Sequence, residues 1–111
     1  MARISTHVLD IAKGAPARGI RLELFFEDHL IRSAETNADG RTDSTLVSAE
    51  AISLGTYQLV FHAGDYLLSA GYPEPLFYDE IAIRFIVSEA YGNYHVPLLL
   101  APHGYSTYRG S

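Results

Sequence analysis

The chain has 111 residues, a formal net charge of −5 and 48% hydrophobic residues, so we expect a single domain over residues 1–111. It contains no cysteine, which excludes a disulfide framework and any zinc or redox chemistry that depends on thiols. Acidic residues outnumber basic ones by 13 to 8, which argues against a nucleic acid or an anionic membrane as partner, because both attract clustered Lys and Arg.

Short segments in which apolar and polar residues alternate run along the whole chain. The alternation is clearest from Ile20 to Phe26, from Tyr57 to His62 and from Ile81 to Val87, where a period of two fits a strand with one buried face. In chain order, strands are expected at residues 4–10, 20–26, 29–35, 41–46, 57–62, 81–87, 94–101 and 105–108.

Turn residues separate these segments and predict an antiparallel sandwich or barrel. The pair Asp39-Gly40 predicts a hairpin turn that has Arg41 immediately after it. One short helix is expected over residues 65–70, because Asp65 can cap its start and Gly71 can end it.

Strand parity groups several side chains that can carry chemistry. In the first strand His7 shares a polar face with Ser5, because successive side chains point to opposite faces. In the late strand His95 looks outward, since the alternate residues are bulky and apolar and suit the core. In the last strand Ser106 shares a face with Tyr108. If these three strands are neighbours, the two His, Ser106 and Tyr108 can line one surface.

No segment has the character of a targeting or membrane-spanning sequence. Residues 4–10 are too polar for a signal-peptide core, and the longest apolar run, Val96 to Pro102, is far shorter than the ~20 residues needed to cross a bilayer. We therefore expect a soluble, cytoplasmic protein with no membrane partner.

The familiar signatures of metal, serine-hydrolase and nucleotide sites are missing, since the chain has no His-x-His pair, HExxH helix, GxSxG elbow or phosphate-binding glycine loop. We expect no metal and no cofactor. His29, His62 and His103 are interpreted as structural or surface residues, the usual state of an isolated His. Arg41 is ordinarily a solvated charge, and its planar guanidinium gains a role only opposite a carbonyl-rich ligand.

Five segments carry a resemblance to a known family. The chain end, Gly104 to Ser111, closely resembles the terminal signature of the 5-hydroxyisourate hydrolases, the transthyretin-related enzymes of urate breakdown. The other matching segments are Ser5–Asp10, Gly14–Ala17, Thr36–Arg41 and Tyr94–Leu100. The resemblance covers essentially the whole chain in unbroken order.

The resemblance implies an all-β fold, a transthyretin-like two-sheet, eight-stranded antiparallel sandwich with one short helix. It also implies a homotetramer, built as a dimer of dimers, with active sites in a channel where the dimers meet. The first, seventh and eighth strands line that channel, and these are the strands that parity groups above. Agreement between the two lines of reasoning favours the family. Carried over by matching motif, the functional positions are His7, Arg41, His95, Tyr108, Arg109, Gly110 and Ser111.

The implied reaction is metal-free and cofactor-free hydrolysis of 5-hydroxyisourate, which opens the six-membered ring at its lactam bond to give 2-oxo-4-hydroxy-4-carboxy-5-ureidoimidazoline. His7 and His95 are the candidates for activating water and moving its proton, because imidazole titrates near neutral pH; which of them is the base stays open. Arg41 would bind substrate oxygens and stabilise developing negative charge.

The terminal residues receive binding roles from the same resemblance. Tyr108 would hold the planar ring, and Arg109 and Gly110 would complete the substrate site. Ser111, with its terminal carboxylate, would shape or polarise the water site. Ser111 as a covalent nucleophile is the less favoured interpretation.

The main alternative is a transthyretin-like carrier that binds a small aromatic ligand in the same intersubunit channel without chemistry. That carrier has Lys in place of His7 and lacks the terminal Tyr-Arg-Gly-Ser, so the residues here favour the enzyme. A purely structural protein with incidental His residues is disfavoured by the same ending.

Two positions depart from the family pattern. His103 stands in the Pro-x-Gly-Tyr turn where many relatives have Tyr or Phe, and it adds a titratable group near the channel. Pro97 lies where the family has an interior strand, although Pro cannot donate to a ladder. We expect a bulge or a missing hydrogen bond at Pro97.

Overall fold

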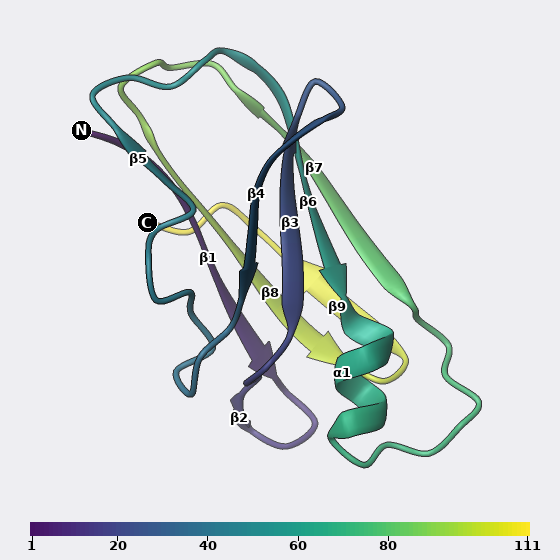
Figure 1. Ribbon diagram of the computed structural model, residues 1–111. Coiled ribbons are helices and arrows are strands. Elements are labelled where there is room, and N and C mark those ends of the chain that lie inside the picture. Colours follow the sequence, from purple (N-terminus) through teal and green to yellow (C-terminus); the bar gives the residue numbers. More distant parts are fainter.

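The computed structural model describes residues 1–111 as two β-sheets packed face to face, with one short helix at an end of the sandwich (Figure 1). The strands of the first sheet are β1 (Ala2–Asp10), β2 (Ala15–Pro16), β5 (Val47–Ala49), β8 (Asn93–Ala101) and β9 (Gly104–Thr107). The strands of the second sheet are β3 (Arg21–Phe26), β4 (His29–Glu35), β6 (Gly55–His62) and β7 (Glu80–Val87). The helix α1 (Ala63–Ser69) follows β6 directly.

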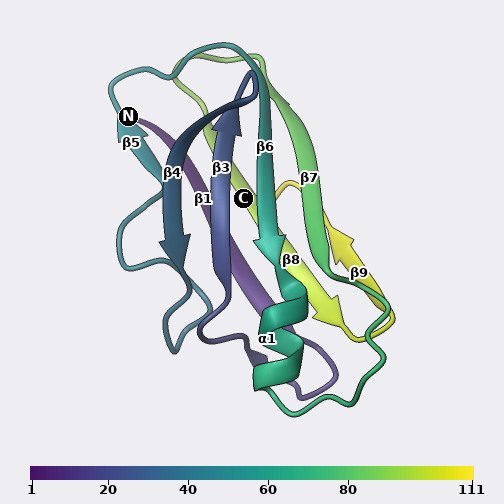
Figure 2. The same ribbon diagram turned by 45° about the vertical axis from the view of Figure 1, so that its right-hand side comes forward.

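The first sheet has the order β2-β1-β8-β9, with β5 also paired to β1, and the second has the order β4-β3-β6-β7. Figure 2 shows from a second direction that β1 and β8 run at an angle to β3 and β6. In these strand orders β7 and β9 are edge strands, and β1 and β8 are interior strands of the first sheet.

The two sheets bury between them the apolar faces that the alternation predicts. Ile4 and Val8 of β1 and Leu98 of β8 are fully buried, and Leu24 and Phe61 meet them from the second sheet's strands. Polar residues of the same strands point outward, because burying one face of a strand leaves the other to solvent. The predicted two-sheet sandwich with one short helix is confirmed.

One strand pair departs from the antiparallel expectation. Strands β1 and β8 run parallel, from Arg3 opposite Asn93 to Asp10 opposite Leu100. Parallel neighbours need a long connection, and here the chain passes through the second sheet between β1 and β8. The strand count is nine instead of eight, because the expected turn around Ala15 contains the two-residue strand β2.

The prediction of a strand at residues 41–46 is wrong. This segment contains no strand, and the three-residue β5 follows it. Side chains there bond locally: Thr42 Oγ1 donates to a backbone carbonyl two residues on at 2.6 Å, and Asn37 Nδ2 donates to Asp43 Oδ1 at 3.0 Å. Such bonds compete with a ladder. A single antiparallel bridge, Thr36 opposite Thr42, is all the pairing that flanks the turn.

The helix begins two residues before the expected position. It starts at Ala63, so Asp65 lies in its first turn and provides no side-chain cap. The chain passes straight from β6 into α1, which leaves no loop residue to cap the start, and the burial of Tyr66 and Leu67 holds the helix against the sandwich. Gly71, with φ of 92°, follows the last turn as predicted.

Pro97 sits in the interior strand without a bulge. The register of β8 on β1 runs uninterrupted through it, with Pro97 opposite His7. On the other side the β8–β9 ladder ends at Leu98 and pairing returns only at His95, opposite Gly110. The Thr107 hydroxyl donates to the Pro97 carbonyl at 2.7 Å. The missing hydrogen bond is confirmed, and it interrupts the ladder where the C-terminal tail begins.

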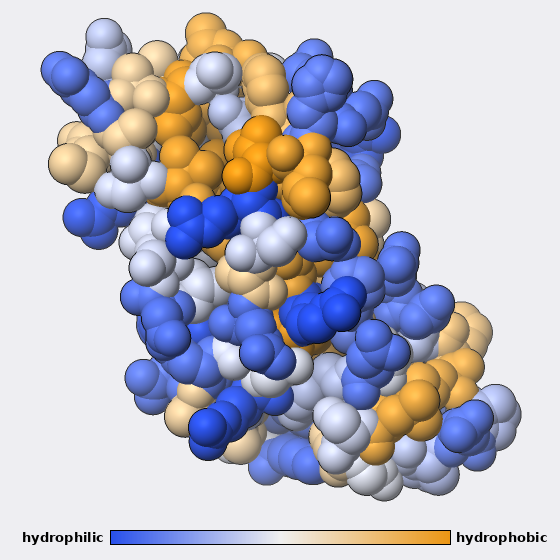
Figure 3. Space-filling view, viewed as in Figure 1, coloured by the Kyte–Doolittle hydropathy of each residue, from blue (hydrophilic) through white to orange (hydrophobic).

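The surface combines polar area with exposed apolar side chains. In Figure 3 hydrophilic residues cover most of the visible side, and hydrophobic ones gather at the upper end and at the lower right. The exposed large apolar residues include Leu30 and Ile31 of β4, Phe77 of the α1–β7 loop and Ile86 of β7. The one helix is seven residues long, and no helix in the chain could cross a membrane.

Asp10 ties the end of β1 to the helix. It is 1% exposed, and its two carboxylate oxygens accept hydrogen bonds from the hydroxyls of Tyr66 and Tyr72, each at 2.8 Å. The backbone amide of Lys13 donates a further bond at 3.0 Å. Burial acts to raise the pKa of Asp10, but these hydrogen bonds and the charge of Lys13 outweigh burial and hold the pKa below its ordinary value.

We expect Asp10→Asn to lower the free energy of unfolding by about 3 kcal/mol, because hydrogen bonds to a charged group contribute ~1.5–3 kcal/mol each. Urea unfolding at pH 7 measures this loss, with Asp28→Asn in the exposed β3–β4 turn as the control. Since folding lowers the pKa of Asp10 from 3.8, its contribution is present above that pH and disappears as pH falls through the folded-state value. Equal stability of both variants at pH 7 would contradict the anchoring role.

Candidate active site

The turn at Asp39-Gly40, which precedes β5, fills a gap beside β1 and carries Arg41. Along that edge of β1, β5 pairs with residues 2–4 and β2 with residues 9–10, and between them the Val8 amide donates to the Gly40 carbonyl at 2.8 Å. Gly40 has φ of 76°, and a Cβ there would collide with the Val8 carbonyl oxygen, so the approach requires glycine. The predicted position of Arg41, immediately beyond this turn, is confirmed.

The same turn selects the tautomer of the neutral His7 ring. The Asn37 side-chain oxygen accepts from the amides of Asp39 at 2.9 Å and Arg41 at 3.2 Å, and this shapes the turn. The Asp39 carbonyl then lies 2.9 Å from His7 Nε2. A carbonyl oxygen only accepts, so Nε2 carries the hydrogen and the neutral ring has its lone pair on Nδ1. His7 therefore offers a basic nitrogen away from the turn.

His95 lies on the same outer face of the first sheet, half-buried. Its Nδ1 is 2.8 Å from the hydroxyl oxygen of Ser5, the residue directly opposite it in the β1–β8 register. Burial lowers the pKa of His95, and repulsion from the neighbouring Arg41 and His7 lowers it further. The ring is therefore neutral at neutral pH, and Arg41, His7 and His95 form one electrostatic cluster.

The C-terminal tail is bound to β8. The Gly110 amide donates to the His95 carbonyl at 2.7 Å, and Arg109 donates to the Asn93 carbonyl at 3.1 Å. The Arg109 guanidinium also lies 4.4 Å from the centre of the Tyr94 ring, a cation–π distance. These contacts bring the last residue, Ser111, to the His95 end of the sheet, where it is exposed.

Tyr108 and Arg109 line a different hollow from the two His residues. It is a pocket of about 240 Å³ at the β7 and β9 edge, with Phe85 and Val96 among its apolar walls. Tyr108 is largely exposed there. In the single chain, the predicted site residues thus divide into a cluster of His7, Arg41, His95 and Gly110 and an edge group of Tyr108 and Arg109.

Sequence reasoning grouped Ser5 with His7 but gave it no role, although it contacts His95 directly. Strand parity indicates which residues share a face, whereas the strand partner decides which of them touch. The pairing of residue 5 with residue 95 depends on a parallel register that the sequence pattern does not reveal.

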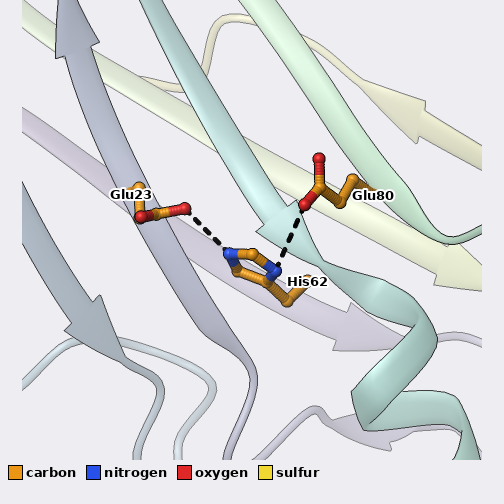
Figure 4. Close-up of polar contacts among 3 residues, drawn as sticks. All are labelled: Glu23, His62 and Glu80. Atoms are coloured by element: carbon orange, nitrogen blue, oxygen red, sulfur yellow. Dashed lines mark hydrogen bonds and ion pairs between the residues drawn. The ribbon is translucent and has the colours of Figure 1, made fainter. Parts of the chain in front are cut away.

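The other three His residues lie outside this cluster. His62 is on the outer face of the second sheet, between two carboxylates, with Nε2 2.8 Å from Glu23 and Nδ1 3.7 Å from Glu80 (Figure 4). His29 is exposed on β4, and His103 lies near the Phe77 ring in the β8–β9 turn. This agrees with their interpretation as structural or surface residues.

The cluster is suited to proton transfer and to binding oxygen atoms. No group of three or more His, Asp, Glu or Cys side chains in the chain is arranged so that it could hold a metal ion. The permanently charged side chain that acts on His95 is Arg41, a cation, which attracts carbonyl or anionic oxygens and repels a metal ion.

Comparisons with known proteins agree on one family. The model of the HIUase/Transthyretin family matches residues 4–110. The chain is 51% identical to 5-hydroxyisourate hydrolase 2 of Rhizobium meliloti, over 98% of this chain and 96% of that protein. The structure of Klebsiella pneumoniae 5-hydroxyisourate hydrolase superposes with a TM-score of 0.87 at 37% identity, covering both chains fully. Transthyretin from Sparus aurata superposes with a TM-score of 0.83 at 25% identity, covering 97% of this chain and 96% of that one.

We expect Gly110→Ala to detach the tail from His95, because a Cβ at residue 110 would lie 2.5 Å from Cδ2 of the imidazole. The ring proton resonances of His95 should shift, and the amide of residue 110 should lose protection from hydrogen exchange. Gly104→Ala is the matched control, since its Cβ would meet no atom within 4 Å. Unchanged His95 resonances in Gly110→Ala would contradict this packing.

Proposed function

The chain belongs to the HIUase/Transthyretin family, and we propose that it hydrolyses 5-hydroxyisourate in urate degradation, as one hydrolase domain over residues 1–111. The product is 2-oxo-4-hydroxy-4-carboxy-5-ureidoimidazoline. The observation that carries the proposal is the cluster of two imidazoles and one guanidinium on the outer face of β1 and β8. Relatives named for this activity are 51% and 37% identical to the chain over nearly its whole length.

The reaction needs a base for water and a proton for the leaving nitrogen. We assign the base to His7, whose Nδ1 lone pair is set by the Asp39 carbonyl on Nε2. Water attacks the lactam carbonyl carbon and gives a proton to Nδ1 of His7. The C–N bond then breaks, and the leaving nitrogen takes up the proton that His7 received from the water, which regenerates the base. His95, kept neutral by burial and by the neighbouring charge of Arg41, relays that proton.

The remaining residues bind the substrate and shape the site around it. Arg41 stabilises the negative charge that develops on the carbonyl oxygen, because a guanidinium offers two donors in one plane. Gly110 holds the tail against His95, which brings the Ser111 carboxylate toward the water site. Tyr108 packs on the planar substrate, and Arg109 supports the tail through Tyr94 and the Asn93 carbonyl.

A carrier function is less well supported. Transthyretin from Sparus aurata shares the fold, but the identity is 25%, about half of that to the hydrolase of Rhizobium meliloti. A carrier also has no use for two imidazoles of which one is held neutral beside a cation.

We expect the protein to accelerate the decay of freshly generated 5-hydroxyisourate, followed by its absorbance. His7→Ala and His95→Ala should each lower kcat by about 100-fold or more, because general acid–base groups contribute ~10²–10⁴. His29→Ala, on the far sheet, is the matched control and should keep the wild-type rate. Wild-type turnover in both site variants would exclude the proton-transfer scheme, and a wild-type protein that binds without turnover would favour the carrier.

We also propose a homotetramer, built as a dimer of dimers, in the cytoplasm. Edge strands β7 and β9 each leave one edge without a partner strand in the single chain, and Ile86, Tyr105 and Tyr108 are exposed along or beside them. Unpaired edges and exposed apolar side chains favour association. The catalytic cluster lies on a sheet face, so a second dimer facing it would enclose the substrate.

Light scattering should give a particle of four times the 12.2 kDa chain mass. Because the proposed site needs a facing dimer, activity should fall on dilution in step with the loss of the tetramer. A monomer with full activity would contradict the assembly and leave the residue assignments unaffected.

A further inference from the structure

The hydroxyl of Ser5 makes one hydrogen bond within the protein, and its partner is Nδ1 of His95 at 2.8 Å. The two residues are 90 positions apart in the chain and directly opposite each other in the parallel β1–β8 ladder. Both side chains are half-buried on the outer face of the sheet. The hydroxyl is therefore placed by two interior strands, with little freedom to leave the ring.

A second contact fixes another edge of the same imidazole. The Gly110 amide donates to the His95 carbonyl at 2.7 Å, and the glycine packs so closely that a Cβ would lie 2.5 Å from Cδ2 of the ring. With Nδ1 against Ser5 and Cδ2 against Gly110, the edge that stays open is the one that contains Nε2.

His95 and His7 differ in the chemistry of their hydrogen-bond partners, the Ser5 hydroxyl and the Asp39 carbonyl. The Asp39 carbonyl beside His7 only accepts, so it permits a single neutral tautomer. A serine hydroxyl both donates and accepts. The Ser5 bond can therefore persist when His95 Nδ1 is bare and when it is protonated, which suits a ring that changes protonation during turnover.

We propose that Ser5 is a positioning residue that holds Nδ1 of His95 and leaves Nε2 as the nitrogen that exchanges a proton with substrate or water. The role rests on the proposed hydrolase function. Ser5 touches no reacting atom; it acts through His95. Arg41 and His7 act electrostatically on His95, and the Ser111 carboxylate follows Gly110 beside it; the proposal leaves all three unchanged.

The test compares Ser5→Ala, which removes the hydroxyl, with Ser5→Thr, which keeps a hydroxyl on a side chain that strands favour. We expect Ser5→Ala to lower kcat at least about 10-fold with KM within about twofold, because a misdirected imidazole loses reactive geometry while substrate binding is kept. Ser5→Thr should recover most of the rate. Ser48→Ala, on β5 of the same sheet, is the control and should match the wild type.

Nitrogen NMR of the free protein gives a readout that does not need substrate. In Ser5→Ala the Nδ1 resonance of His95 should shift and its pH titration should change, while the Nε2 resonance of His7 stays in place. A purely structural Ser5 would leave the His95 nitrogens unchanged in the folded variant.

Three results would overturn the assignment: a wild-type kcat in Ser5→Ala, unmoved His95 resonances, or a folded Ser5→Thr as slow as Ser5→Ala. If His95→Ala loses activity while Ser5→Ala does not, the Ser5 proposal alone is wrong. If the wild type does not hydrolyse 5-hydroxyisourate, the proposed function is wrong, and the Nδ1 resonance still decides whether Ser5 positions the ring.

Discussion

The parallel register of β1 on β8 is the constraint on which the site depends. It sets Ser5 opposite His95 and leaves His7 two residues further along the same face. Buried side chains such as Ile4 and Leu98 hold this register, since a slip of one residue would turn every apolar side chain of a strand to solvent. Burial of the hydrophobic core beneath them therefore supplies the energy that places the two strands that carry the imidazoles.

Two glycines allow other segments to approach this ladder. Gly40 lets the turn that carries Arg41 lie against β1, and Gly110 lets the tail lie against the ring of His95. The tail can reach that position because Pro97 interrupts the β8–β9 ladder. The Pro97 carbonyl, which has no ladder partner there, accepts a hydrogen bond from the Thr107 hydroxyl. Interior strands thus hold the two His residues rigidly, and the turn and the tail add Arg41 and the C-terminal residues beside them.

The two imidazoles are chemically distinct although both lie half-buried on the outer face of one sheet. A carbonyl fixes the tautomer of His7, whereas a hydroxyl faces His95 and accepts either form. Burial and the charge of Arg41 keep His95 neutral. Differences in the neighbouring atoms therefore give two identical side chains different hydrogen-bonding environments, and the roles proposed for His7 and His95 follow from them.

The sequence by itself determined which strands have a buried face, which side chains share the outer face and where Arg41 follows its turn. These features depend on neighbours within a few residues, through the period of two and the turn chemistry of Asp39-Gly40. It did not reveal the parallel β1–β8 pair or the contact of Ser5 with His95. Only the tertiary structure decided these, because a strand's partner and register are chosen by packing between residues 90 positions apart, which no local pattern encodes.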